Sequence, residues 1–491
     1  MDALPILLLL PLLFGAVIAV LAALWRSAAA QVVAVVATAT ALILSVIALV
    51  TVTVDGTITH HLGGWPPPVG IEYVLDPLTA YLAVIIALIG LMVCIYPVQA
   101  AFDLTPARGV PLYPLVLLLL TGLMGVVLSG DLFHLFVFLE IYAISTYALV
   151  SLGGDRGVFA SLRYLLLGTI GSGLYLLGVG FLYFMTGTLN MADMAQRLPA
   201  IADSPTVLGA MALIVIGLAL KMALFPLHVW LPDAHSYSPP GVAALLAAVQ
   251  VKAGAYALIR ILFDVFGPAY TGGAGLPVSA ALTWFGAAGI IFGSVLAIQQ
   301  TDLKRMLAYS TVAQLGYIGV GIGLANPLAL VGALLHVLNH ALMKSGLFLV
   351  AGGVIQQTGL KTISRFTGLG KRMPWTMAGF AIAGLSMVGI PPFAGFFSKF
   401  YLVLGALEGD NWVLAAVIVF SSLLTLLYFV RLFEQIFVRE PVEAVVEGAR
   451  EPGARVVGTV GMLAAAIVLV GVFNAVLVGQ VLLPIATRML G

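Results

Sequence analysis

Long apolar segments constrain this chain more than any other feature of its sequence. A bilayer core about 30 Å thick needs about 20 apolar residues per helix. Fourteen such segments follow one another, at about 4–25, 29–53, 75–98, 111–130, 131–152, 158–186, 206–232, 239–264, 278–299, 303–323, 326–354, 374–407, 411–438 and 455–485. We therefore expect an all-α polytopic membrane protein with about 14 transmembrane helices, the first retained rather than cleaved as a signal peptide.

The small number of charges excludes a soluble protein with a very large core. Of 491 residues, 8% are charged, whereas soluble domains carry about 25%. The net charge of +1 argues against nucleic acid as a partner. The single Cys94 allows no internal disulfide and no cysteine metal site, and the sequence has no G-x-x-x-x-G-K phosphate loop. We therefore predict no cofactor and no metal.

Basic residues orient the bundle, because Lys and Arg accumulate on the cytoplasmic side of membrane proteins. Two of them, Arg197 and Arg488, fall on one side of the fourteen segments. Fourteen fall on the other side: Arg26, Arg108, Arg156, Arg163, Lys304, Arg305, Lys361, Arg365, Lys371, Arg372, Arg431, Arg439, Arg450 and Arg455. Both termini are therefore predicted to lie outside.

Several charged side chains remain within the apolar segments. Each costs about 2.5–3.5 kcal/mol at the helix centre, so charged residues there usually face a hydrated interior and carry function. Arg260, near the outer end of its segment, is expected to snorkel toward water. Structural ion pairs are the alternative explanation for the others, which are Glu140, Lys221, Lys252, Lys344 and Lys399.

Glu140 is a natural partner for one of these lysines. A nearby carboxylate favours the charged ammonium, whereas burial favours the neutral amine. A partner that moves could therefore switch a lysine between holding and releasing a proton, as a pump or an antiporter requires.

The motif HVLNHALMKSGLF places His336, His340 and Lys344 four residues apart. Side chains at this spacing form one stripe on a helix, and histidine titrates near neutral pH. The stripe could relay protons, form a passive hydrogen-bonded core, or contribute two histidines to a zinc site without a third ligand nearby.

Prolines interrupt two of the segments, Pro226 and Pro232 in the seventh and Pro391 and Pro392 in the twelfth. Interrupted helices at matching positions of two halves are typical of transport sites. Lys221 precedes the first interruption and Lys399 follows the second. We therefore expect a five-helix repeat of helices 4–8 over 111–265 and of helices 9–13 over 278–438, flanked by helices 1–3 in 1–110 and by helix 14 in 455–491.

Titratable residues at two segment ends leave two interpretations open. Glu72 and Asp76 precede the third segment, and Asp131 and His134 begin the fifth. They could line an outer vestibule or form solvated loop charges.

Four motifs in order resemble one known family. FPLHVWLPDAHSYSPPGVAALLAAVQVKAGAYALIR, TDLKRMLAYSTVAQLGY, HVLNHALMKSGLF and GIPPFAGFFSKFYL are similar to the proton-translocating antiporter-like family. This family includes the antiporter-like subunits of respiratory complex I and the large subunits of Mrp-type sodium/proton antiporters. The similarity covers roughly residues 70–440 and is strongest to the D subunit of the Mrp complex.

The resemblance implies inverted repeats and a role for each buried charge. Glu140 matches the glutamate that pairs with the lysine of the broken seventh helix, Lys221. Lys252 matches the lysine linking the two half-channels, and Lys399 matches the terminal lysine of the broken twelfth helix. His336, His340 and Lys344 match the polar axis of the eleventh helix.

The resemblance also implies a function, a location and partners. The chain would be a proton-translocating subunit, not an enzyme, in a bacterial cell membrane, with protons and Na⁺ as its ions. Its partners would be a large A subunit and small membrane subunits. The alternatives are a proton-pumping subunit of complex I or of a membrane-bound hydrogenase, a structural subunit with a dead channel, and a stand-alone transporter of a small solute or bicarbonate.

Overall fold

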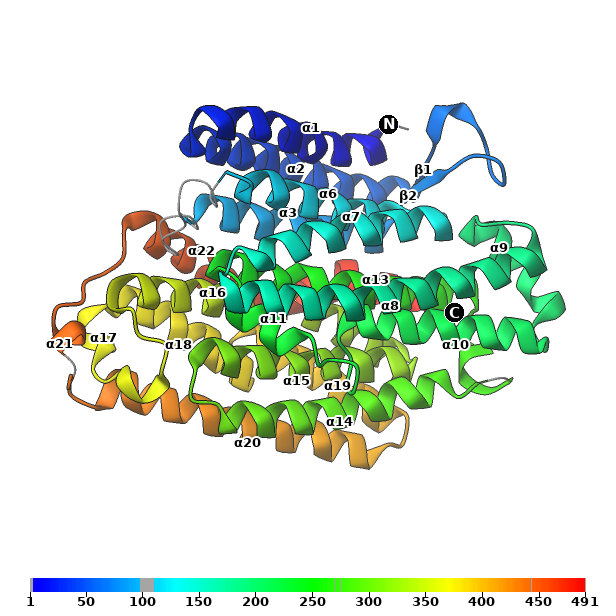
Figure 1. Ribbon diagram of the computed structural model, residues 1–491. Coiled ribbons are helices and arrows are strands. Elements are labelled where there is room, and N and C mark those ends of the chain that lie inside the picture. The colour runs from blue at the N-terminus through cyan, green and yellow to red at the C-terminus, as the bar shows by residue number, and fades with distance from the viewer. Residues whose placement is uncertain (1–2, 98–109, 269, 275, 443, 491) are drawn as a thin grey trace.

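The computed structural model describes residues 3–97, 110–268, 270–274, 276–442 and 444–490, so Arg108 lies outside the described residues. It is a bundle of roughly parallel helices (Figure 1). The first layer contains α1 (Leu4–Trp25), α2 (Ser27–Asp55) and α3 (Pro77–Ile95). Between α2 and α3, β1 (Ile58–His61) and β2 (Glu72–Leu75) form an antiparallel hairpin in which Ile58 pairs with Leu75.

The next ten segments form the body of the bundle. The first five are α6 (Leu112–Leu128), α7 (Leu132–Ser151), α8 (Asp155–Thr186), α10 (Pro205–Met222) with α11 (Leu231–Tyr237), and α12 (Pro240–Leu245) continuing through η3 (Leu246–Gln250), α13 (Val251–Ile259) and η4 (Arg260–Val265). The second five are α14 (Val278–Gln299), α15 (Leu303–Leu324), α16 (Pro327–Thr358), α18 (Pro374–Val388) with α19 (Ala394–Glu408), and α20 (Trp412–Phe433) with η7 (Glu434–Val438).

The remaining elements are short or lie at the C-terminus. They are η1 (Leu62–Gly64), α9 (Met191–Arg197), η2 (Leu198–Ile201), η5 (Tyr270–Ala274), η6 (Ile363–Arg365), α17 (Leu369–Arg372), α21 (Ala444–Glu447), α22 (Ala454–Val472), α23 (Asn474–Leu477), η8 (Val478–Leu482) and α24 (Leu483–Leu490). The hairpin and both termini lie at one end of the bundle, and α17 and α21 lie at the other (Figure 1). We call these the terminus-bearing end and the loop end.

Twelve helices of the described residues are long and apolar enough to cross a membrane. They match twelve of the fourteen expected segments. The other two segments, the fourth and the twelfth, are the shorter helix Leu112–Leu128 and the broken helix that begins with Pro374–Val388. The all-α polytopic class is confirmed, and the difference in number comes from one short helix and one interrupted helix.

Equivalent local features identify the two repeats. Asp131 caps α7 and forms a β-bridge with Asn190, while Asp302 caps α15 and forms a β-bridge with Thr362. A repeat of five helices is odd, so the second copy starts from the opposite side of the bundle. The two repeats are therefore inverted relative to each other, as expected.

The two broken helices end in the same way. Ala223 terminates α10 with a left-handed φ of 58°, and Gly389 terminates α18 with a φ of 93°. A cis proline bond follows two residues later in each, at Phe225–Pro226 and Pro391–Pro392. The sequence interpretation is wrong for Pro232, because this residue lies in the first turn of α11 and does not interrupt a helix.

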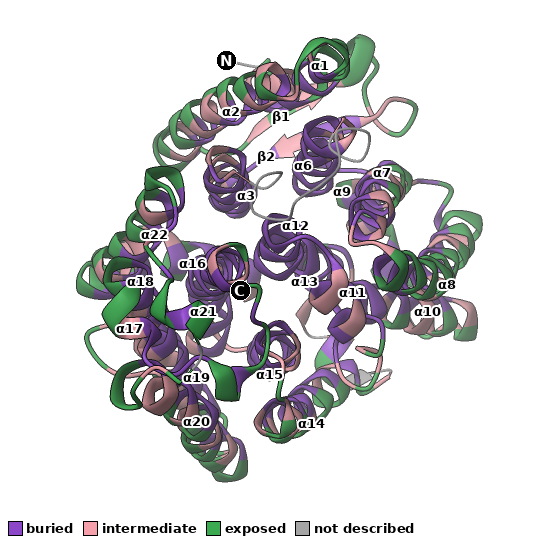
Figure 2. Cartoon of the chain, turned by 60° about the vertical axis from the view of Figure 1, so that its left-hand side comes forward, coloured by how far each residue is buried: buried purple, intermediate pink, exposed green. Residues whose placement is uncertain are grey.

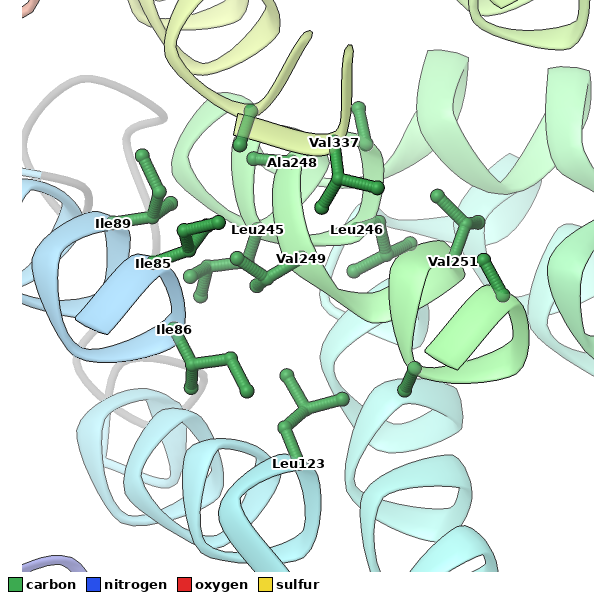
Figure 3. Packing of buried hydrophobic residues seen from close by; sticks show 14 of the residues in the cluster. Ile85, Ile86, Ile89, Leu123, Leu245, Leu246, Ala248, Val249, Val251 and Val337 are labelled. Carbon is green, nitrogen blue, oxygen red and sulfur yellow. The ribbon is translucent and has the colours of Figure 1, made fainter. Parts of the chain in front are cut away.

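Burial increases from the first layer toward the centre (Figure 2). The most apolar window of Ser27–Asp55 is 33% buried, whereas that of Pro327–Thr358 is 94% buried and that of Pro240–Val265 is wholly buried. Apolar side chains of α3 and α6 pack around Pro240–Val265, which we call the central helix, among them Ile85, Ile86 and Leu123 (Figure 3). Five of the buried titratable residues lie on the central helix and on Pro327–Thr358: Lys252, Arg260, His336, His340 and Lys344.

Candidate functional site

The carboxylate predicted to pair with a lysine does so. Glu140 on α7 and Lys221 near the end of α10 form an ion pair, with Oε1 and Nζ 3.3 Å apart. The Lys221 side chain is 1% exposed and that of Glu140 is 27% exposed. Ser172 on α8 also donates a hydrogen bond to Glu140 Oε1, so the carboxylate bridges two further helices of the first repeat.

The break after α10 fixes the position of Lys221. A helix end leaves carbonyl oxygens without intrahelical partners. The Trp230 indole donates to the carbonyl of Leu220 at 3.0 Å and so folds the interrupted segment back over the helix end. Trp230 itself stacks on Tyr164 of α8, with ring centroids 4.0 Å apart. The lysine is therefore held where regular helix stops.

Gly254 brings the next lysine close to this break. A Cβ at Gly254 would come within 2.7 Å of the backbone nitrogen of Met222, so only glycine lets α13 approach the end of α10 this closely. Lys252 precedes this contact by two residues and is 2% exposed. The contact places the helices that carry Lys221 and Lys252 against each other.

Lys252 connects the first repeat to α16 of the second. Its Nζ lies 2.7 Å from His340 Nδ1 and donates a hydrogen bond to the carbonyl of Ala247. The imidazoles of His336 and His340 stack, with centroids 5.9 Å apart and planes 6° apart. These contacts form a continuous line of polar groups from α13 into α16.

The line continues from α16 to the second broken helix. His336 Nδ1 lies 2.9 Å from Ser398 Oγ, next to Lys399 on α19. Lys399 Nζ donates to the carbonyls of Met387 and Val388 at 3.0 Å each. These carbonyls are the C-terminal end of α18, where the helix dipole favours a cation.

Lys344 lies one turn beyond His340 on α16 and has its hydrogen-bond partners on α15. Its Nζ donates to the Leu307 carbonyl at 2.7 Å and to Ser310 Oγ, both on α15. It therefore points to α15, whereas His340 on the same helix contacts Lys252. Among the described residues, no group of three His, Cys, Asp or Glu residues could hold a metal ion.

Several buried polar atoms of this region have no hydrogen-bond partner among the described residues. They include Nε2 of His336 and of His340, and both ring nitrogens of His235. Buried water usually satisfies such groups where the site is polar. His235, on α11 and fully buried, was not singled out from the sequence, although it lies within the first of the four quoted motifs. Ser172, Ser310 and Ser398 were missed too, because a single serine in an apolar helix gives no signal.

The charges at the terminus-bearing end are not solvated loop charges. Glu72, Asp76, Asp131 and His134 are all at most 9% exposed. Arg260 is 7% exposed and does not snorkel, which corrects the sequence interpretation. Its guanidinium instead pairs with Asp76, with Nη2 and Oδ1 2.5 Å apart.

Two interrupted helices around a line of buried amines and imidazoles are features of ion-translocating membrane proteins. Residues 129–425 match the family described as "NADH:quinone oxidoreductase/Mrp antiporter, TM". The chain belongs to this family, as the resemblance of its motifs implies.

Relatives from two kinds of complex are similar to the chain. The N subunit of the NADH-quinone oxidoreductase of Desulforudis audaxviator is 53% identical, over 81% of this chain and 77% of the relative. The D subunit of the Na(+)/H(+) antiporter of Alkalihalophilus pseudofirmus is 36% identical, over 78% of this chain and 77% of the relative. A chain in the structure of the Mrp complex from a Dietzia species superposes with a TM-score of 0.89 at 26% identity, covering 99% of this chain and 97% of that chain.

Proposed function

We propose that this chain is the proton-translocating subunit of a multi-subunit cation/proton antiporter. Protons would move through the bundle along Glu140, Lys221, Lys252, His340, His336 and Lys399. Lys344 would hold a proton beside this line, where it donates to α15. The observation that carries the proposal is the chain of contacts from Lys252 through His340 and His336 to Ser398, beside Lys399. Each of these histidines and lysines is at most 6% exposed, so the line runs inside the protein and not in lipid.

The Glu140–Lys221 pair is the step that sets proton release. Lys221 is held as an ammonium by a carboxylate 3.3 Å away, while its burial favours the neutral amine. When Glu140 moves away or is protonated, Lys221 passes its proton toward Lys252 through water. The imidazoles then take and give a proton at opposite nitrogens, Nδ1 and Nε2. Lys399 delivers the proton on the far side of the second break.

The surroundings of Glu140 support the expected partner subunits. Phe133, Val137 and Ile144 lie on the same face of α7 and are 46%, 37% and 62% exposed. A carboxylate 27% exposed on such an apolar face is costly against lipid. We propose that another membrane subunit of the complex covers this face.

The assignment of the cation-exchange function rests on the relatives named as antiporter subunits. A second candidate is a proton-pumping subunit of a redox complex, which the relative named as an oxidoreductase subunit favours by its 53% identity. Both candidates use the same proton line and differ in what drives it.

Replacement of Glu140 tests the proton line. Glu140→Gln keeps the shape of the side chain but removes the charge that holds Lys221. Cation-dependent proton exchange in inverted vesicles should fall at least about tenfold, which corresponds to about 1.4 kcal/mol of barrier. Glu440→Gln, an exposed glutamate paired with Lys371 at 2.6 Å, is the matched control and should exchange normally. Normal exchange by an assembled Glu140→Gln complex contradicts the proposal.

Purification of the complex that contains this chain tests whether cation exchange or electron transfer drives the protons. An antiporter releases protons from vesicles on addition of Na⁺ and contains no iron. Iron–sulfur subunits in the purified complex, together with proton uptake driven by a reductant, would support the redox alternative instead.

A further inference from the structure

A buried ion cluster closes the terminus-bearing end of the central helix. Arg260, at the start of η4, makes four hydrogen bonds with groups of α3 and of its own helix. Its guanidinium donates to Tyr256 Oη at 2.8 Å, to Thr79 Oγ1 at 2.8 Å, to Asp76 Oδ1 at 2.5 Å and to Asp264 Oδ2 at 2.7 Å. The cluster therefore joins the end of the central helix to the start of α3.

Asp76 keeps its charge in this position. Burial on its own would raise the pKa of its carboxyl group, but the charge of Arg260 and hydrogen bonds from Arg260 and the Thr79 amide lower that pKa to about 2. Asp76 is therefore ionised at neutral pH and fixes the guanidinium in place.

A cavity of about 350 Å³ leads to this cluster from the terminus-bearing end. Its polar lining includes Glu72, Asp76, Tyr256, Arg260, Asp264 and Arg488. Arg488 and Asp264 are exposed, whereas Asp76 and Tyr256 are buried at 4% and 2% exposure. Water can therefore reach the cluster from this end.

The proton line passes a short distance beyond the cluster, at Lys252. Lys252, Tyr256 and Arg260 are four residues apart on one helix and so lie on the same side of it, about 6 Å apart per step along the axis. Lys252 already contacts His340 of the second repeat. A water path from the cavity to Lys252 would connect the proton line to the terminus-bearing side and dissipate the gradient.

The hydrogen bonds of the cluster prevent such a path. Proton hopping needs groups that can accept a proton and donate one, and a guanidinium has only donors and stays protonated. Arg260 occupies a lone pair of each hydroxyl. The Thr79 and Tyr256 hydroxyls lie 3.1 Å from each other, and both reach the carbonyl of Val127, at 3.0 Å and 2.6 Å, so the hydrogen bonds that they donate end at this carbonyl. A backbone carbonyl cannot pass a proton on, so both hydroxyls end the path.

We infer that Arg260 is a positioning residue that seals the central proton line at the terminus-bearing end. Its guanidinium, which has only donors, fills the passage between the cavity and Lys252. It also orients the Thr79 and Tyr256 hydroxyls toward the Val127 carbonyl. This inference rests on the proposed proton line. With this end sealed, protons enter and leave the proton line only where a conformational change of the protein opens a path.

The test replaces the ion pair by shorter or neutral groups that leave room for water, which can relay a proton. Arg260→Gln/Asp76→Asn removes one charge of each sign and shortens the side chain at position 260, so that water from the cavity can enter between the cluster and Lys252. Purified complex carrying the double variant is placed in liposomes with a pH gradient and without Na⁺. Passive proton leak should rise about tenfold over wild type, which corresponds to about 1.4 kcal/mol of barrier.

Two further variants separate a proton path from a general packing defect. Arg197→Gln/Asp193→Asn removes an exposed ion pair of 2.9 Å at the same end and should leave the leak unchanged. Adding Tyr256→Phe to the Arg260→Gln/Asp76→Asn variant removes a hydroxyl and should lower the leak again. A double variant whose proton leak equals that of wild type would contradict the proposed seal. A leak of the double variant that Tyr256→Phe does not lower would contradict it too.

The outcomes also distinguish this inference from the proposed function. If wild-type liposomes show no cation-dependent proton exchange but the double variant leaks, the seal holds and the antiport assignment fails. If exchange is present and the double variant does not leak, the antiport assignment holds and the seal fails.

Discussion

At the scale of residues, the four buried lysines named in the proposed function have different partners and so can have different tasks. Lys252, Lys344 and Lys399 donate to backbone carbonyls, which solvate an ammonium but take no proton. Of these four lysines, Lys221 alone pairs with a carboxylate among the described residues. A carboxylate can be protonated or displaced, so the energy of the ammonium can change at this position more than at the others.

The 2.7 Å contact between Lys252 and His340 predicts how their substitutions combine. Lys252→Met and His340→Leu each interrupt the same serial path, so each should lower proton exchange at least about tenfold. The double variant should be no worse than either single variant, because a path that is already interrupted loses nothing more. Proton flux in inverted vesicles measures this.

Lys371→Met serves as the control for these two variants, because Lys371 is exposed and pairs with Glu440. Losses that multiply in the double variant would mean two independent paths and would contradict a single line through this contact.

At the scale of elements, both interruptions are built by the same backbone turn but from different residues. Gly389 adopts the left-handed conformation at the end of α18 without a steric penalty. Ala223 adopts it at the end of α10, where a side chain costs about 1–2 kcal/mol. The first break is therefore strained at one residue and the second is not.

This difference predicts the effect of glycine at the first break. Ala223→Gly relieves the strained φ and should stabilise the chain by up to about 1 kcal/mol. Ala212→Gly, in the interior of the same helix, should destabilise it by about 1 kcal/mol. Thermal unfolding midpoints of the purified complex should therefore shift in opposite directions. Equal losses in both variants would mean that the left-handed turn is not strained.

At the scale of the whole molecule, the charge distribution predicts which side of the membrane each end of the bundle faces. The hairpin lies at the terminus-bearing end, and the loop that carries Val442 lies at the loop end. Since Lys and Arg are concentrated at the loop end, the terminus-bearing end should face outward.

Two matched cysteine variants test this orientation. Val69 in the hairpin loop and Val442 before α21 are 82% and 81% exposed. In a Cys94→Ser background, a membrane-impermeant maleimide should label Val69→Cys in intact cells but label Val442→Cys only after the cells are opened. The reverse pattern would invert the orientation and exchange the two sides of the proposed seal.

Much of the site follows from the sequence because isolated charges are conspicuous in apolar helices. Glu140 and Lys221 were expected as a pair, and the structure brings them to 3.3 Å. His336 and His340 were placed on one stripe by their spacing, and their rings stack. The serine partners were not found, because a serine is common in membrane helices and its role depends on what it faces.

The sequence by itself determined the membrane class, the five-helix repeat and the identity of the buried charges, because apolar length, proline position and stranded charges are local properties. Only the tertiary structure decided which buried charges meet. Lys344 donates to α15, and Arg260 is buried and paired with Asp76. Helix rotation and close approach at residues such as Gly254 set these contacts, and both depend on how whole helices pack.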